Sequence, residues 1–255
     1  MTDKTQKTAL VTGAARGIGL ATAHLFLDRG WRVAMVDIDG AELGRAASGL
    51  TDVLAITADV SDPEQVAGIR QKVSELDSSL AALVNNAGVA DFGPIAETTF
   101  DRWRRVMATN LDGPFLMTQA FTEALAKARG AVVNITSISG VRASTLRVAY
   151  GTSKAALAHL TLQQAVELGE LGVRVNAVAP GPVDTKLAMA VHTADIRAAY
   201  HDAIPLNRYG QEAEIANAIV FLCSAEASYV TGQILAADGG FSAAGVGLPS
   251  LRLSD

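Results

Sequence analysis

Tyr150 and Lys154 lie four residues apart in the segment YGTSK, and Ser137 precedes the tyrosine by thirteen residues. Four residues make about one helical turn, so the two side chains share a face of a helix. A unit positive charge about 4 Å away contributes roughly 4 kcal/mol at an effective dielectric constant of about 20. Because one pKa unit corresponds to about 1.4 kcal/mol, Lys154 is expected to lower the pKa of Tyr150 by about two or three units from about 10. With the Ser137 hydroxyl holding a substrate oxygen, the pattern predicts proton transfer near neutral pH.

A glycine-rich turn, TGAARGIG at positions 12–19, lies between an apolar run and a helical pattern. Gly13 permits a tight turn, whereas Gly17 and Gly19 let the backbone and the helix approach a pyrophosphate. The spacing is G-x-x-x-G-x-G, and its place between a strand and a helix is the context that a dinucleotide site requires. The segment therefore predicts a dinucleotide cofactor.

The choice between the two nicotinamide cofactors depends on Asp37 and Arg16. Asp37 follows the glycine turn by about twenty residues, where a carboxylate can accept hydrogen bonds from ribose hydroxyls and repel a 2′-phosphate. Arg16 points the other way, because a guanidinium there could pair with that phosphate. We weigh Asp37 more heavily, since an unpaired carboxylate facing a phosphate is costly whereas Arg16 can turn into solvent. NAD is therefore the expected cofactor, and NADP is the alternative.

These residues would be positioned by an alternation of apolar runs and helical patterns. Strands are expected at 8–12, 32–37, 53–59, 81–86, 131–136, 173–180 and 233–238. Helices are expected at 17–28, 63–76, 100–128 (as one helix or two), 150–170 and 211–225. Most strand candidates are apolar at nearly every position, which is typical of parallel strands covered on both faces. The alternation predicts an α/β fold: a Rossmann-type, doubly wound, seven-stranded parallel sheet with helices on both faces.

The composition favours one folded domain over residues 1–255, with 49% hydrophobic residues and a formal net charge of -5. The acidic balance argues against nucleic acid as a partner. With no secretory signal and no apolar stretch of membrane-spanning length, we expect a cytoplasmic protein without a membrane partner. The single cysteine, Cys223, is expected to be a small buried hydrophobe. The four histidines show no metal-ligand spacing, so they are interpreted as structural and no metal is expected.

The motifs and their order resemble those of the short-chain dehydrogenase/reductase family over almost the whole chain. The matching segments are TGAARGIG (12–19), Asp59-Val60, NNAG (85–88), Asn110, Ser137, YGTSK (150–154) and PGPVDT (180–185). The resemblance implies an oxidoreductase that moves a hydride between a nicotinamide and a CH–OH group. It also implies a catalytic set of Asn110, Ser137, Tyr150 and Lys154, in which Asn110 holds a water that links Lys154 to solvent.

The resemblance also implies how the cofactor is bound and how the protein assembles. Asp59 and Val60 would lie along the adenine, Lys154 would bind the nicotinamide ribose, and Thr185 would lie near the carboxamide. The full expected cofactor set is Gly13, Arg16, Gly17, Ile18, Gly19, Asp37, Ile38, Asp59, Val60, Asn86, Ala87, Gly88, Tyr150, Lys154, Pro180, Gly181, Val183 and Thr185. Family members are commonly tetramers built through the helices at about 100–128 and 150–170, so a homotetramer is expected.

Substrate contacts are expected in loops at the carboxyl ends of the strands, where open α/β sheets bind ligands. These loops are 89–94, 139–147 and 182–208, and the last is expected to act as a lid. The expected substrate residues are Ser137, Ser139, Arg142, Arg147, Tyr150 and Leu187. An inward-pointing arginine would favour an anionic or polyhydroxylated substrate, but both arginines are expected to face solvent, because arginine is mostly exposed. The tail 241–255 is expected to dock on a neighbouring subunit or to fray.

The leading hypothesis is an NAD-dependent oxidoreductase that interconverts a small secondary alcohol, such as a polyol or a sugar, and a ketone. A 3-oxoacyl thioester reductase that uses NADPH is the alternative within the class, and Asp37 counts against it. A dinucleotide-sensing protein without catalysis is the alternative from another class, and the intact set of predicted catalytic residues counts against it. A hydrolase is disfavoured because Ser137 has no G-x-S-x-G elbow.

Overall fold

One parallel sheet forms the centre of the computed structural model, which describes residues 6–76, 79–185 and 192–245. Seven strands within these residues pair in the order β3-β2-β1-β4-β5-β6-β7. They are β1 (Lys7–Thr12), β2 (Arg32–Asp37), β3 (Val53–Thr57), β4 (Ser79–Asn85), β5 (Ala131–Ile135), β6 (Arg174–Pro180) and β7 (Ile234–Ala237). The strand order reverses between β1 and β4, and a crevice at such a reversal is where doubly wound sheets bind ligands.

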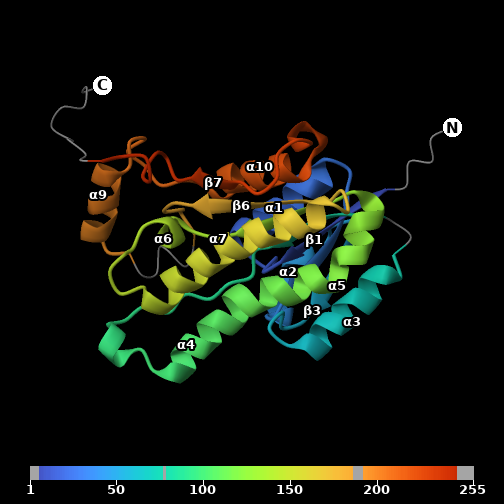
Figure 1. Cartoon of the computed structure of the whole chain (residues 1–255), viewed down its shortest axis with the longest axis horizontal. Coiled ribbons are helices and arrows are strands. Elements are labelled where there is room, and N and C mark those ends of the chain that lie inside the picture. Colours follow the sequence, from blue (N-terminus) through green and yellow to red (C-terminus); the bar gives the residue numbers. More distant parts are fainter. Residues whose placement is uncertain (1–5, 77–78, 186–191, 246–255) are drawn as a thin grey trace.

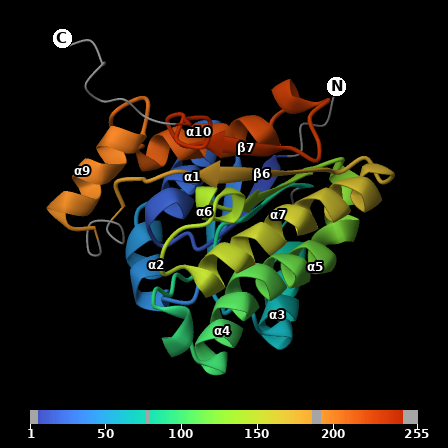
Figure 2. The same ribbon diagram turned by 60° about the vertical axis from the view of Figure 1, so that its left-hand side comes forward.

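Helices cover both faces of this sheet (Figures 1 and 2). One face carries α1 (Gly17–Asp28), α2 (Gly40–Ala47) and α10 (Glu212–Cys223). The other carries α3 (Pro63–Ser74), α5 (Gly113–Ala128) and α7 (Val148–Gly169), with α4 (Phe100–Met107) packed beside α7. Every residue of β5 is buried, as expected for a strand covered on both sides. The predicted fold class is confirmed.

Most predicted elements lie within two residues of the observed ones. The helix predicted at 100–128 consists of α4 and α5, joined by η2 (Ala108–Asp112), which is a π-helical turn. The strand predicted at 53–59 is too long, because Thr57 ends β3 and Asp59 turns the chain by accepting hydrogen bonds from Ser61. Helices α2, α6 (Ile138–Val141) and α9 (Ala194–Ala203) were not predicted.

Cys223 ends α10 inside the core, and burial raises the pKa of its thiol to about 12. The prediction of a small buried hydrophobe is therefore confirmed. Across the described residues, the structure contains no helix that is both long and apolar enough to cross a bilayer.

Candidate active site

Hydrogen bonds join the glycine turn after β1 to the segment that follows β4. The side-chain amide of Asn86 donates hydrogen bonds to the carbonyls of Thr12 (2.9 Å) and Gly13 (3.1 Å). In return, the Thr12 hydroxyl accepts from the backbone N–H groups of Asn86 and Ala87, each at 3.0 Å. Gly13 and Gly17 both have a φ of 63°, a left-handed conformation that favours glycine. Helix α1 then begins at Gly17 with no side-chain cap and no acidic residue in its first turn, so its N-terminus suits an anionic group.

Asp37 lies at the end of β2, and its carboxylate organises the turn beside it. It accepts hydrogen bonds from the backbone N–H groups of Ala15 and Asp39, each at 3.0 Å. Arg16 pairs with Asp39, whose pKa is lowered by the backbone N–H of Glu42 and by this guanidinium. Arg16 is exposed to solvent, as the sequence allowed, and it also has a carboxylate partner there.

The three predicted reacting side chains lie together at the end of β5. Ser137 is 7% exposed, and its Oγ accepts a hydrogen bond from the N–H of Ser139 at 3.1 Å. Tyr150, which comes from the first turns of α7, lines the same cavity as Ser137. Lys154 is 4% exposed, and its Nζ lies 5.8 Å from the centroid of the Tyr150 ring. The phenol, the hydroxyl and the ammonium predicted to act together are therefore brought together.

The predicted lowering of the Tyr150 pKa by Lys154 is wrong. Burial raises the pKa of Tyr150, and this effect outweighs the lowering by the hydrogen bond with Ser137 and by the charge of Arg147. The Lys154 ammonium donates instead to the carbonyl of Ile135 at 2.7 Å, and burial lowers its own pKa to about 8. Sequence spacing placed the two groups on one face but did not show how strongly burial disfavours both charges.

Asn110 lies in the π-helical turn η2 and is fully buried. Its side-chain amide donates to the carbonyl of Val89 (2.9 Å) and to the hydroxyl of Ser153 (3.0 Å). Its side-chain oxygen accepts from the N–H of Val89 at 2.8 Å. Asn110 thus holds the start of the loop 89–94 against α7. Its expected role in a water relay to Lys154 stays a prediction.

A cavity of about 260 Å³ opens over these residues. It is lined by Ile18, Asn86, Gly88, Val89, Ala90, Phe92, Ile135, Thr136, Ser137, Ile138, Ser139, Arg147, Tyr150, Lys154, Pro180, Gly181, Pro182, Val183, Thr185, His192 and Tyr200. The lining contains cofactor residues expected around the nicotinamide and most of the expected substrate residues. The residues expected around the adenosine and pyrophosphate, from Gly13 to Val60, lie outside it apart from Ile18. Leu187 falls outside the described residues.

The two predicted substrate arginines have different positions. Arg147 lines the cavity, with its guanidinium carbon 4.6 Å from the centroid of the Phe92 ring and 6.0 Å from that of Tyr150. The expectation that Arg147 faces solvent is therefore wrong. Arg142 is exposed and donates to the carbonyls of Phe241 and Ala244, each at 3.2 Å. The start of the expected C-terminal tail is thus tied to the loop 139–147 of the same chain.

His192 and Tyr200 form another part of the wall, from the segment expected to be a lid. The two rings stack at 5.4 Å, and His192 Nδ1 lies 3.0 Å from the Tyr209 hydroxyl. Burial and the charges of Arg147 and Arg197 lower the pKa of His192, so its ring is neutral at neutral pH. His192 thus lies in the cavity wall, and the interpretation of the histidines as structural stays a prediction.

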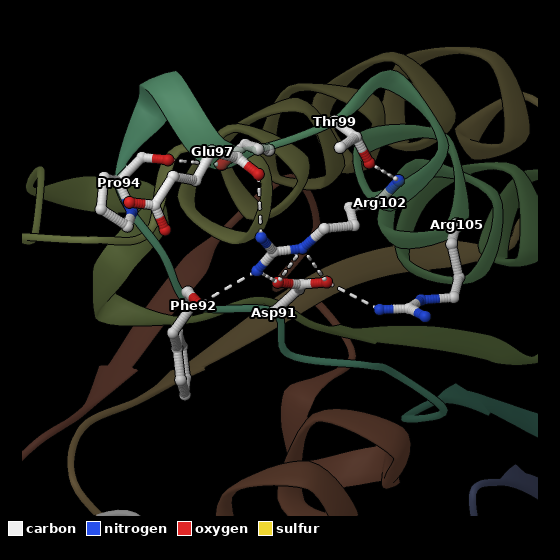
Figure 3. Close-up of polar contacts among 8 residues, drawn as sticks. Asp91, Phe92, Pro94, Glu97, Thr99, Arg102 and Arg105 are labelled. Atoms are coloured by element: carbon white, nitrogen blue, oxygen red, sulfur yellow. Dashed lines mark hydrogen bonds and ion pairs between the residues drawn. The ribbon is translucent and has the colours of Figure 1, made fainter.

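The loop that carries Phe92 is held by a charged cluster that the sequence analysis missed (Figure 3). Arg102, on α4, pairs with Asp91 and donates to the carbonyls of Phe92 (3.1 Å) and Glu97 (3.0 Å). Arg105 adds a second contact to Asp91 at 2.6 Å. The Arg102 and Arg105 guanidiniums lower the pKa of Asp91. The sequence contained a signal for this cluster: Asp91 is the one charged residue of the loop 89–94, and Arg102 and Arg105 follow it about one helical turn apart.

The residues around the glycine turn fit a nicotinamide dinucleotide. Asp37 and the uncapped start of α1 offer partners for a ribose and a pyrophosphate. On the cavity side, a Cβ at Gly181 would lie 2.7 Å from the Cα of Asp238, so only glycine lets the segment after β6 run this close to the end of β7. When bound, a nicotinamide supplies hydride chemistry. Among the described residues, no three histidine, cysteine or acidic side chains are grouped to hold a metal ion.

Comparisons with known proteins agree with this arrangement. Residues 13–242 match the family described as Enoyl-(Acyl carrier protein) reductase. The chain is 41% identical over 240 residues to galactitol 2-dehydrogenase (L-tagatose-forming) of Cereibacter sphaeroides, covering 92% of this chain and 94% of that protein. It is 40% identical over 245 residues to cis-4-hydroxycyclohexanecarboxylate dehydrogenase of Sinomonas cyclohexanicum, covering 93% of this chain and 97% of that protein.

A solved structure of 4-hydroxyisoleucine dehydrogenase complexed with NADH has a TM-score of 0.88 and 28% identity. The match covers 94% of this chain and all of that one (100%). The chain belongs to the short-chain dehydrogenase/reductase family, and it is an oxidoreductase that acts on CH–OH groups with a nicotinamide dinucleotide.

Proposed function

We propose that the protein interconverts a small secondary alcohol and the corresponding ketone, with NAD as the cofactor and Tyr150 as the general acid and base. The observation that carries the proposal is that Ser137, Tyr150 and Lys154 line one cavity, with the Lys154 Nζ 5.8 Å from the centroid of the Tyr150 ring. The carboxylate of Asp37 supports NAD over NADP. The pairing of Arg16 with Asp39 adds to this preference, because it occupies the cation that a 2′-phosphate would need.

Each reacting side chain has a defined part in this proposal. The Ser137 hydroxyl hydrogen-bonds the substrate oxygen and holds it beside Tyr150. Because burial raises its pKa, Tyr150 is protonated at neutral pH and gives its proton to the ketone oxygen during reduction. During oxidation the tyrosinate takes the alcohol proton, so this direction speeds up as pH rises. Lys154, whose pKa burial lowers to about 8, lies beside the Tyr150 ring and would bind the nicotinamide ribose.

The size of the cavity favours a small substrate, and a polyol, a sugar or another small hydroxyl compound meets this limit. Its volume of about 260 Å³ lies just below the roughly 300–1,000 Å³ typical of small-molecule sites. The names of the two relatives, a galactitol dehydrogenase and a hydroxycyclohexanecarboxylate dehydrogenase, fit this class. A relative that is 35% identical over 240 residues, the 3-oxoacyl-[acyl-carrier-protein] reductase of Aquifex aeolicus, keeps the NADPH-dependent thioester reductase as the second candidate.

Assembly as a homotetramer and a place in the cytoplasm remain predictions. Apolar side chains exposed on α5 and α7, namely Phe115, Leu162 and Val166, support burial of these two helices against other subunits. Light scattering of the purified protein would measure the number of subunits.

The test is a spectrophotometric assay of nicotinamide reduction with polyols, sugars, hydroxy acids and 3-hydroxyacyl thioesters, each with NAD and with NADP. We expect turnover of a small alcohol with NAD. Preference for a thioester with NADP would instead support the second candidate. Tight cofactor binding with no turnover of any compound would support a dinucleotide-sensing protein.

A further inference from the structure

We propose that the substrate carries a carboxylate, that Arg147 binds this group, and that the alcohol is therefore a hydroxy acid or a sugar acid. The proposal rests on the function proposed above and specifies its substrate class. It starts from the position of Arg147, which lines the same cavity as Ser137 and Tyr150 and immediately precedes α7.

The charge balance of the cavity favours an anion. Its lining includes two cationic side chains, Arg147 and Lys154, and no aspartate or glutamate among the described residues. Lys154 already donates a hydrogen bond to the carbonyl of Ile135, and it lies beside the phenol of Tyr150. Arg147 forms no ion pair within the part of the chain that the structure describes. A half-buried guanidinium without a counter-charge is costly, and a carboxylate from the substrate would relieve that cost.

The donors of Arg147 are available to such a group. A guanidinium has five N–H donors, arranged to meet a carboxylate in two parallel hydrogen bonds. Within the described residues, the only side-chain acceptor it reaches is the hydroxyl of Ser139, at a long 3.4 Å. The N–H of Ser139 in turn donates to Ser137. Ser139 therefore contacts both Ser137 and the Arg147 guanidinium, so a substrate held by Ser137 lies near the guanidinium.

The guanidinium is also held in place, as a specificity-determining group must be. It lies over the ring of Phe92 at 4.6 Å, and the carbonyl of Phe92 is bound by Arg102. The backbone of the two loops is joined as well, since the N–H of Gly93 donates to the carbonyl of Leu146 at 2.9 Å. Leu146 has a φ of 62°, a left-handed conformation rare for leucine, so the surrounding contacts fix the turn that presents Arg147.

The experiment compares 2-, 3- and 4-hydroxy acids of four to six carbons with their carboxamides, in the wild type and in Arg147→Gln, Arg147→Lys and Arg142→Gln. The readout is the ratio of kcat/KM for each acid to that for its amide. Any effect of Arg147 on proton transfer by Tyr150 cancels in this ratio, because the acid and its amide both react through Tyr150. We expect the wild type to prefer acids about ten- to a hundredfold, the range for a hydrogen bond to a charged group. Arg147→Gln should abolish the preference, Arg147→Lys should retain part of it, and Arg142→Gln should retain all of it.

An equal preference in the wild type and in Arg147→Gln, or none in the wild type, would overturn the proposal. A second measurement distinguishes failure of the carboxylate site at Arg147 from failure of the proposed function. If no alcohol is turned over, the proposed function fails, but binding of propionate, butyrate and hexanoate to the NADH-loaded protein still tests the arginine by thermal shift. Carboxylates that stabilise the wild type more than their amides do, and lose this advantage in Arg147→Gln, support the site. Equal stabilisation by acids and amides contradicts it.

Discussion

The guanidinium of Arg147 lies over the ring of Phe92, 4.6 Å from its centroid. The two residues come from loops that follow different strands, and their contact joins those loops beside Tyr150 and Ser137. Phe92 also meets the ring of Tyr150 edge to face, with the centroids 6.2 Å apart. The Arg147 guanidinium is thus positioned by the same aromatic side chain that packs against the Tyr150 ring.

Replacing Arg147 should shift the pH dependence of alcohol oxidation. The charge of Arg147 lowers the pKa of Tyr150, so Arg147→Gln should raise that pKa and move the rise in kcat/KM for a neutral alcohol to higher pH. The measurement is a pH profile with a carboxamide substrate. An unchanged profile would show that the guanidinium does not act on the phenol.

Replacing Arg102 should destabilise the protein and weaken substrate binding. Arg102 bonds Asp91 and two backbone carbonyls, and a hydrogen bond to a charged group contributes about 1.5–3 kcal/mol. We expect Arg102→Ala to lower the free energy of unfolding by about that much and to raise KM through Phe92. Urea unfolding and steady-state kinetics measure both effects.

Arg105→Gln is the matched control, because the Arg105 side chain is 65% exposed and contacts only the other edge of Asp91. Its cost should stay below about 1 kcal/mol, as for surface ion pairs. If Arg105→Gln costs as much as Arg102→Ala, the backbone contacts of Arg102 contribute nothing.

Replacing Asp37 should relax the choice of cofactor. We expect Asp37→Asn to lower the ratio of kcat/KM with NAD to that with NADP by about tenfold, because a neutral amide no longer repels a 2′-phosphate. Asp101→Asn removes one charge from the first turn of α4, away from the glycine turn, and should leave the ratio unchanged. A ratio that Asp37→Asn does not alter would remove the basis for preferring NAD.

Glu214 should make stability depend on pH in the acid range. Its carboxylate pairs with Arg208 and accepts from the N–H of Gln211, and together they lower its pKa from 4.5 to about 2. A folded-state pKa below the unfolded one stabilises the fold above pH 4.5, and the effect fades as pH falls toward 2. The side chain is 44% exposed, so Glu214→Gln should cost only about 0.5–1 kcal/mol at neutral pH. Denaturation curves at neutral and acid pH measure the difference in the free energy of unfolding between the wild type and Glu214→Gln. This difference should shrink as pH falls, and a difference that does not change with pH would contradict the assignment.

The sheet and the pairing of Tyr150 with Lys154 could be predicted because both follow from local patterns, whereas the place of Ser137 beside them was implied by the family resemblance. Buried parallel strands appear as short apolar runs, and a spacing of four residues places two side chains on one helical face. Helix α2 was missed because its sequence, GAELGRAA, contains two glycines, although Asp39 before it is a helix cap. Helix α9 was missed although Thr193 caps it in the same way.

The electrostatics of the site could not be predicted in the same way. The direction of the Arg147 side chain depends on Phe92, which is distant in sequence, and the pKa of Tyr150 depends on burial that spacing does not show. The pairing of Arg16 with Asp39 depends on how two neighbouring turns fold against each other. Each of these features arises from tertiary contacts between loops.

The central claim is that the Tyr150 hydroxyl moves the proton when the alcohol and the ketone interconvert. The most direct test is nicotinamide reduction by Tyr150→Phe with the best alcohol found for the wild type, together with NADH binding followed by fluorescence. Loss of the hydroxyl should lower kcat by a factor of at least about a hundred, the lower range for general acid–base catalysis, with cofactor affinity nearly unchanged. Turnover by Tyr150→Phe at close to the wild-type rate would contradict the account.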